Sequence, residues 1–137
     1  MQSELMEPAT PEGLSALPED VLIVEDDLII ALDFEEAILG FGVKTVRTAG
    51  TVATALDMIA DRAPDFALLD VGLIREKSFA IAARLDTLKI PFVFVTGYST
   101  EVLLPPAFAD RPRLPKPYSS DALRALLKCQ PGGNTTR

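Results

Sequence analysis

The length of 137 residues suits one folded domain with a substantial core, and 48% hydrophobic with 24% charged residues is ordinary for a globular protein. The formal net charge of −7 argues against nucleic acid as a direct partner, because phosphate binding requires clustered Lys and Arg. The chain contains no histidine, which excludes catalytic triads, histidine general bases and most zinc sites.

The sequence also lacks the features of a membrane or secreted protein. No apolar run approaches the ~20 residues of a membrane-spanning helix. The N-terminal residues carry acids and prolines but no basic segment followed by an apolar one, and Cys129, the single cysteine, excludes an internal disulfide. We therefore expect a cytoplasmic protein with no membrane partner.

Short apolar runs alternate with helical patterns in chain order. The patterns predict strands at 21–24, 43–47, 66–69, 91–95 and 111–114. They predict helices at 28–39, from 52 to before Pro64, at 78–88, and after Ser119. In the first of these helices the apolar face is assigned to Leu28, Ala31, Leu32 and Leu39.

Repeated strand–helix units predict an α/β fold with a parallel sheet and helices on both faces. One domain spans residues 19–129. Residues 1–18 are expected to form a flexible leader and residues 130–137 a flexible tail.

Polar side chains follow four of the predicted strands, and parallel strands deliver such residues to one edge of the sheet. Each group alone has a structural explanation as a helix cap, a turn or a solvated lysine. Their joint occurrence favours a functional site. The four groups are Glu25-Asp26-Asp27, Asp70, Thr96-Gly97 and Lys116-Pro117.

Together these residue types suit phosphoryl transfer. Carboxylates within ~4 Å repel one another and need a cation, and a few oxygen ligands that leave room for water and phosphate suit Mg²⁺. The metal and the Lys116 ammonium would screen a carboxylate nucleophile as it approaches an anionic phosphorus. The Thr96 hydroxyl would donate a hydrogen bond to a phosphoryl oxygen, and Gly97, which has no side chain, leaves room for the phosphoryl group.

The ordered motifs resemble a response-regulator receiver domain of the chemotaxis-receiver kind over about residues 19–129. They are Val21-Leu-Ile-Val-Glu-Asp, Leu69-Asp70, Phe94-Val-Thr96-Gly97 and Leu114-Pro-Lys116-Pro117-Tyr118. The resemblance implies a flavodoxin-like, doubly wound five-stranded parallel sheet with strand order 2-1-3-4-5. It also implies a role in two-component signalling as a phosphoacceptor rather than an enzyme, with a histidine kinase or phosphotransfer protein as phosphodonor.

The resemblance also implies residue roles. Asp70 would be the phosphoacceptor, and Thr96 and Lys116 would contact the phosphoryl group. Asp26 would bind Mg²⁺ directly and Glu25 partly through water, while Asp27 caps a helix. The remaining assignments are Gly72 as a metal ligand through its backbone carbonyl, and Gly97, Tyr98, Arg113 and Tyr118 as the switch and partner surface.

The chain departs from the family pattern in two places. Arg113 stands where an aromatic switch residue is expected, so rotation of a buried ring cannot be the readout. The segment between Thr96 and Lys116 is short and broken by prolines, which predicts a missing or degenerate fourth helix. Both features resemble an alphaproteobacterial subfamily with a Phe-Ala-Thr-Gly-hydrophobic-Tyr motif that serves HWE-type kinases, although Val95 and Ser99 depart from that motif.

Three functions remain open from the sequence. The leading one is a stand-alone receiver that signals by protein contact or acts as a phosphate sink, with a phosphate-dependent change in the 97–118 surface as the switch. The second is a phosphorylation-independent adaptor with a receiver fold. The third is a haloacid-dehalogenase-type phosphatase, which would want an aspartate at position 72, where this chain has glycine.

Overall fold

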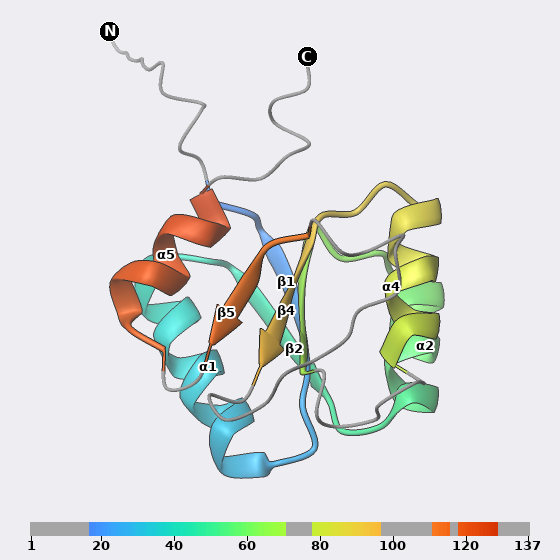
Figure 1. Ribbon diagram of the computed structural model, residues 1–137, viewed down its shortest axis with the longest axis horizontal. Coiled ribbons are helices and arrows are strands. Elements are labelled where there is room, and N and C mark those ends of the chain that lie inside the picture. Colours follow the sequence, from blue (N-terminus) through green and yellow to red (C-terminus); the bar gives the residue numbers. More distant parts are fainter. Residues whose placement is uncertain (1–16, 71–77, 97–110, 116–117, 129–137) are drawn as a thin grey trace, which may run out of the picture.

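A five-stranded parallel sheet lies between two layers of helices (Figure 1). The structure is a computed structural model and describes residues 17–70, 78–96, 111–115 and 118–128. The strands are β1 (Asp20–Val24), β2 (Thr45–Ala49), β3 (Phe66–Asp70), β4 (Phe92–Thr96) and β5 (Arg113–Pro115). The helices are α1 (Leu28–Phe41), α2 (Val52–Asp61), α4 (Ser78–Thr87) and α5 (Ser120–Lys128). The strand order β2-β1-β3-β4-β5 confirms the predicted flavodoxin-like fold.

The strand residues alternate between two separate cores. Even-numbered residues of β1 and β4, such as Leu22 and Phe94, face α2 and α4, and odd-numbered ones, such as Ile23 and Val95, face α1 and α5. Because both faces are covered, β1 and β3 are buried along their whole length. This explains why their sequences are nearly continuous apolar runs.

Three sequence predictions about these elements were wrong. The fifth strand begins at Arg113 rather than at residue 111. The second strand begins at Thr45 rather than at residue 43, since Val43 closes the end of α1 and is buried before the strand starts. The apolar face assigned to α1 was also wrong, because Leu28, Leu32 and Leu39 are 81%, 53% and 44% exposed. The residues of α1 that enter the core are Ala31, Phe34 and Ile38.

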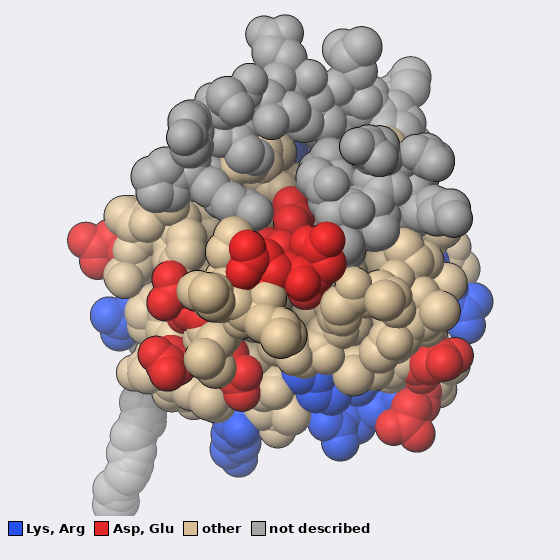
Figure 2. Space-filling view, turned by 90° about the horizontal axis from the view of Figure 1, so that it is seen from below, with Lys and Arg blue, Asp and Glu red and all other residues tan. Residues whose placement is uncertain are grey.

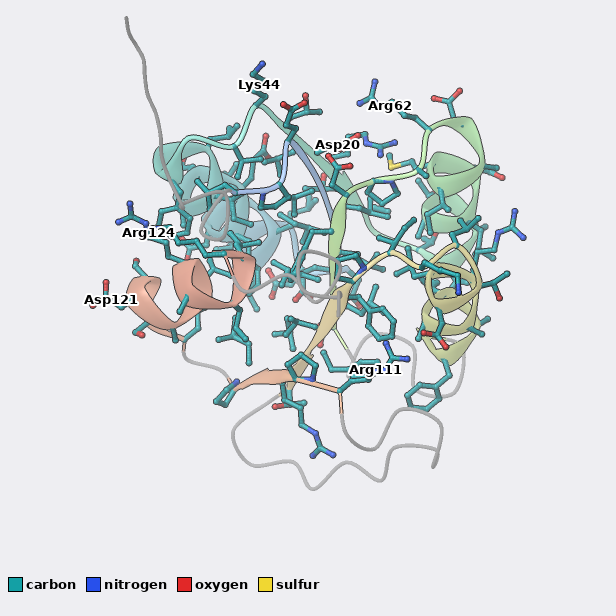
Figure 3. The ribbon with its side chains drawn as sticks, turned by 90° about the horizontal axis from the view of Figure 1, so that it is seen from above. Asp20, Lys44, Arg62, Arg111, Asp121 and Arg124 are labelled. Atoms are coloured by element: carbon teal, nitrogen blue, oxygen red, sulfur yellow. The ribbon has the colours of Figure 1, made fainter. Side chains whose placement is uncertain are left out.

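Arg111 lies two residues before the start of β5. Its guanidinium forms an ion pair with Asp86 at the end of α4 and lies over the ring of Phe92, 5.0 Å from the centroid (Figure 3). These contacts fix the start of β5 against α4. The predicted missing or degenerate fourth helix falls at 97–110, outside the described residues, as do nearly all of the expected leader and the tail at 130–137.

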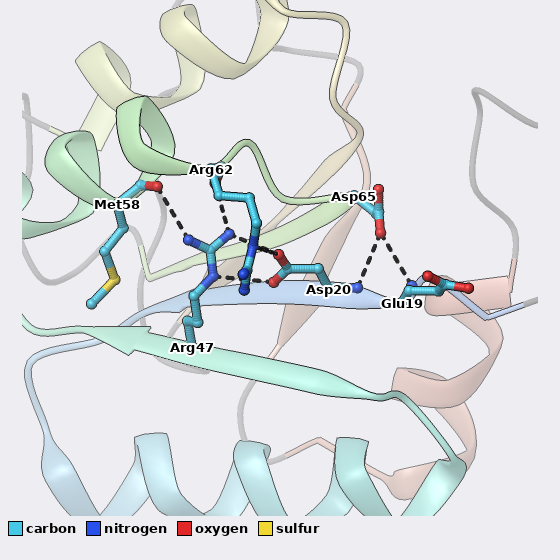
Figure 4. A network of polar contacts seen from close by, with 6 residues as sticks. All are labelled: Glu19, Asp20, Arg47, Met58, Arg62 and Asp65. Carbon is cyan, nitrogen blue, oxygen red and sulfur yellow. Dashed lines mark hydrogen bonds and ion pairs between the residues drawn. The ribbon is translucent and has the colours of Figure 1, made fainter.

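An ion-pair network ties four elements together at the N-terminal edge of the sheet (Figure 4). The Asp20 carboxylate accepts hydrogen bonds from Nε and one terminal nitrogen of Arg47 at 3.1 and 3.0 Å, and from Arg62 Nε at 2.9 Å. Arg47 also donates to the carbonyls of Met58 and Arg62, and Asp65 accepts from the backbone N–H of Asp20. The network therefore links β1 and β2 to the end of α2 and the start of β3.

None of the helices among the described residues is long and apolar enough to cross a membrane, the longest being α1 with 14 residues.

We expect Asp20→Ala to lower the free energy of unfolding by about 3 kcal/mol, because it leaves the largely buried Arg47 guanidinium without its carboxylate. Arg62→Ala should cost less than about 1 kcal/mol, since the Arg62 side chain is 59% exposed and its ion pair is screened by solvent. Urea denaturation of both variants measures the difference. Equal losses would contradict the inference that Arg47 is the partner that matters.

Two helices end in the same hydrogen-bond motif with different residues at the left-handed position. After α1, Gly42 (φ 112°) and Val43 donate to the carbonyls of Leu39 and Ile38. After α4, Lys89 (φ 61°) and Ile90 donate to Asp86 and Leu85 in the corresponding pattern. Lys89 therefore occupies a conformation that costs a residue with a Cβ roughly 1 kcal/mol.

Lys89→Gly should raise the free energy of unfolding by roughly 0.5–1 kcal/mol, because it relieves the strain at φ 61° and retains both hydrogen bonds. Lys89→Ala is the matched control and should give no gain, since alanine keeps the Cβ. Thermal denaturation of the two variants tests this. A gain from alanine as large as that from glycine would show that loss of the lysine charge is the cause.

Candidate functional site

An acidic cluster lies at the C-terminal edge of the sheet. Glu25 and Asp26 directly follow β1, and Asp70 is the last residue of β3. The pairing of Val24 with Leu69 brings the two strand ends side by side, and one carboxylate oxygen from each acid lies within 4.8 Å of the others. Viewed from this edge, acidic side chains gather at the centre of the face (Figure 2). The structure thus brings together three residues that the sequence predicted to meet.

The cluster is mostly buried and is held by the start of α1. Glu25 and Asp70 are 3% and 6% exposed, whereas Asp26 is open to solvent. The Asp27 N–H donates to Glu25 Oε2 at 3.1 Å, and the Asp27 carboxylate accepts from the N–H groups of Ile29 and Ile30. This confirms Asp27 as a helix cap. The turn that begins α1 therefore also orients Glu25.

The composition of the cluster fits a small, hard cation. Two full negative charges ~5 Å apart repel by about 3 kcal/mol at an effective dielectric constant of 20. Oxygen ligands of one Mg²⁺ lie ~2.1 Å from the ion and so at most ~4.2 Å apart. The three carboxylate oxygens lie within 4.8 Å of one another, which is only slightly more than this distance. Small side-chain rotations, or a water ligand in place of one carboxylate, would complete the coordination of the ion. Glu25, Asp26 and Asp70 could hold such an ion.

Thr96 and the end of β5 lie at the same edge. Asp70 of β3 pairs with Val95 of β4, and Thr96 of β4 pairs with Pro115 of β5. The ends of these three strands therefore lie at nearly the same level of the sheet. Thr96 is half-buried. Lys116 directly follows Pro115 in the sequence and lies outside the described residues, as do Gly72, Gly97 and Tyr98.

The other predicted surface residues have different environments. Arg113 is exposed on β5, next to the buried Leu114. Tyr118 is half-buried and stacks on Phe34 of α1, with ring centroids 4.5 Å apart and planes 13° apart. Burial raises the pKa of the Tyr118 phenol, and the nearby Asp33 carboxylate raises it further. The phenol is therefore neutral at physiological pH.

An exposed apolar patch, which we define as Leu28, Ile29 and Leu32, lies beside the acidic cluster on the first turns of α1. Their exposed fractions are 81%, 79% and 53%. This patch was not predicted from the sequence, because Leu28 and Leu32 were expected on the buried face of the helix. The spacing of the larger side chains Phe34, Ile38 and Phe41 was the signal that could have set the helix phase correctly.

No model of a known protein family matches the chain. The chain is 30% identical to the transcriptional regulatory protein PdtaR of Mycobacterium tuberculosis (strain H37Rv) over 121 residues, which is 85% of this chain and 59% of PdtaR. The chain therefore spans less than two thirds of that relative's length.

Solved structures extend the comparison. The solution structure of SdrG from Sphingomonas melonis Fr1 is 40% identical, with a TM-score of 0.70 over 80% of this chain and 93% of SdrG. A second SdrG structure shows its BeF3-activated conformation, with 40% identity and a TM-score of 0.66 over 82% of this chain and 98% of SdrG. The receiver domain of the Erythrobacter litoralis response regulator PhyR is 25% identical, with a TM-score of 0.65 over 79% of this chain and 85% of that domain. The chain therefore belongs to the response-regulator receiver family.

Proposed function

We propose that this chain accepts a phosphoryl group on Asp70 from a histidine kinase or phosphotransfer protein, with Mg²⁺ as cofactor. The observation that carries the proposal is the buried acidic cluster, in which Asp70 ends a central strand beside Glu25 and Asp26. Three acids close enough to repel one another lower the stability of the fold. Their grouping is explained if they bind a cation or take part in a reaction. The SdrG conformation activated by BeF3, a mimic of a phosphoryl group, supports the same chemistry here.

In the proposed reaction, an Asp70 carboxylate oxygen attacks the phosphorus of a phosphohistidine. A P–O bond forms and the P–N bond breaks, and the bonding electrons return to the imidazole of the donor, which then takes up a proton. Thr96 lies one strand away, where its hydroxyl would donate to a phosphoryl oxygen. Lys116, one residue beyond the partner of Thr96, would supply a positive charge to the same group.

Glu25, Asp26 and Asp70 would hold Mg²⁺ through their carboxylates, with Gly72 as a backbone ligand. When bound, the ion offsets the negative charge that otherwise keeps a carboxylate and a phosphoryl group apart. The Asp27 N–H keeps Glu25 oriented toward the cluster.

The apolar patch supports a protein as phosphodonor. Leu28, Ile29 and Leu32 are exposed directly beside the acids, and burying them would offer a partner a hydrophobic anchor. The segment from Glu25 to Val43 carries six acidic residues and no basic ones, so a complementary donor surface would be basic around an apolar centre. We propose that the phosphodonor docks on this patch.

Phosphorylation would shift the population of conformations of the 97–118 surface, and a protein partner would recognise the new conformation. Alternatively, the chain would act only as a sink that drains phosphate from the donor. Arg113 is exposed on β5 and available to such a partner. The subfamily motif around Thr96 makes an HWE-type kinase the donor to test first.

Asp70→Asn should abolish labelling by acetyl phosphate or by a phosphorylated kinase, because the amide cannot form the acyl phosphate. Removal of Mg²⁺ with EDTA should abolish labelling of the wild type. Asp65→Asn is the matched control, since Asp65 precedes the same strand at the opposite edge, and it should remain labelled. The measurement is radiolabel retained after gel filtration.

Equal labelling of wild type and Asp70→Asn would contradict the proposal. Failure of the wild type to bind BeF3 in the presence of Mg²⁺ would favour the phosphorylation-independent adaptor. Steady turnover of small phosphate esters would favour the phosphatase, and we expect negligible turnover.

The double variant Leu28→Ala and Ile29→Ala should slow labelling by a kinase about tenfold, a loss of ~1.4 kcal/mol. Labelling by acetyl phosphate, which needs no docking surface, should be unchanged. Leu88→Ala is the control, because Leu88 is 40% exposed but precedes β4 at the other edge of the sheet. A parallel loss with both phosphodonors would show damage to the acceptor site instead of the docking surface.

A further inference from the structure

Asp27 is held by hydrogen bonds from its side chain and from both of its backbone polar groups. Its carboxylate Oδ1 accepts from the N–H groups of Ile29 and Ile30 at 2.9 and 3.2 Å. Its carbonyl accepts from the Ala31 N–H at 2.9 Å, and its own N–H donates to Glu25 Oε2 at 3.1 Å. The direction of that N–H therefore depends on the capped turn that follows it.

Glu25 is consequently held by two different elements. Its backbone N–H donates to the Ala49 carbonyl at 2.9 Å, directly after the last pair of β1 with β2. Its side chain, which is 3% exposed, accepts from the Asp27 N–H at the start of α1. The sheet thus fixes where the Glu25 side chain begins, and the turn helps to fix where its carboxylate lies. A metal ligand whose carboxylate is hydrogen-bonded in this way is oriented before the ion binds.

The Asp27 carboxylate has a different task from its neighbours. Glu25, Asp26 and Asp70 each offer an oxygen to a common point, whereas Asp27 Oδ1 accepts from the N–H groups at the start of α1. Loss of a residue that hydrogen-bonds a metal ligand typically lowers metal affinity roughly 10–100-fold. The Asp27 side chain acts one step further away, through the turn, so its loss should have a smaller effect.

We propose that Asp27 is a positioning residue, which raises the affinity of the acidic cluster for Mg²⁺ by capping α1 and so holding the turn that orients Glu25. This inference rests on the proposed function, in which Glu25, Asp26 and Asp70 hold the ion. The coupling is reciprocal, so that metal binding strengthens the cap by the same factor by which the cap strengthens metal binding. The free energy of a typical N-cap corresponds to a factor of about five.

Asp27→Ala and Asp27→Asn both remove the Asp27 charge, but only asparagine keeps an oxygen that can cap α1. The affinity for Mg²⁺, measured from backbone amide NMR signals during titration with MgCl₂, should be about fivefold lower for Asp27→Ala than for Asp27→Asn. Thr51→Ala is the matched control, since Thr51 caps α2 at the same edge of the sheet by accepting from the Thr54 N–H. This control also loses a cap and should bind Mg²⁺ as the wild type does.

Amide hydrogen exchange tests the reciprocal effect in the wild-type protein, independently of whether any variant folds. Saturating Mg²⁺ should slow exchange of the Ile29 and Ile30 N–H groups about fivefold, because the metal favours the capped turn. Exchange of the Thr54 N–H, which the cap of α2 holds, should not change.

Equal affinities of Asp27→Ala and Asp27→Asn would overturn the proposal, because the Asp27 charge alone would then explain any loss. A loss of the same size in Thr51→Ala would also overturn it, since general destabilisation would be the cause. Unchanged exchange at Ile29 and Ile30 on metal binding would contradict it separately. Absence of Mg²⁺ binding by the wild type would instead contradict the proposed function, which distinguishes the two failures.

Discussion

Mutual repulsion among Glu25, Asp26 and Asp70 is the constraint on which the rest of the structure depends. Like charges at this spacing oppose folding by several kcal/mol in total wherever they are not offset. The sheet has to supply that energy through its two buried faces, and the start of α1 has to keep Glu25 in place through the Asp27 backbone. A fold this well packed can hold acids together that a looser structure would release to solvent.

Stability and chemistry are divided between the two edges of the sheet. At the N-terminal edge, Asp20 is matched by Arg47 and Arg62, so its buried charge is neutralised within the protein. At the C-terminal edge, the carboxylates of Glu25, Asp26 and Asp70 lie close together instead. At the first edge, the protein itself supplies the opposite charges that the buried acid needs. The second edge groups oxygen atoms of the kind that a small, hard cation binds.

The sheet and the acids could be predicted from the sequence because both depend on local rules. An apolar run covered on both faces reads as a buried strand, and the residue after it lies at the sheet edge, which located Glu25, Asp26 and Asp70. The phase of α1 could not be predicted in this way, because Leu28 and Phe34 are both apolar and only packing against β1 and α5 decides which is buried. The Tyr118–Phe34 stack was equally invisible, since it joins residues far apart in the chain.

The interior position of β1, between β2 and β3, has a consequence for synthesis of the chain. β1 is made first, yet it pairs with β3 on one side, and ribosomes need roughly 2–9 s to add the residues between them at 5–20 residues per second. During that interval the apolar run Val21–Val24 can pair with only one strand, β2. The acids on either side of the run, Asp20 and Glu25, place like charges on every nascent copy. These charges oppose aggregation of new chains until the third strand arrives.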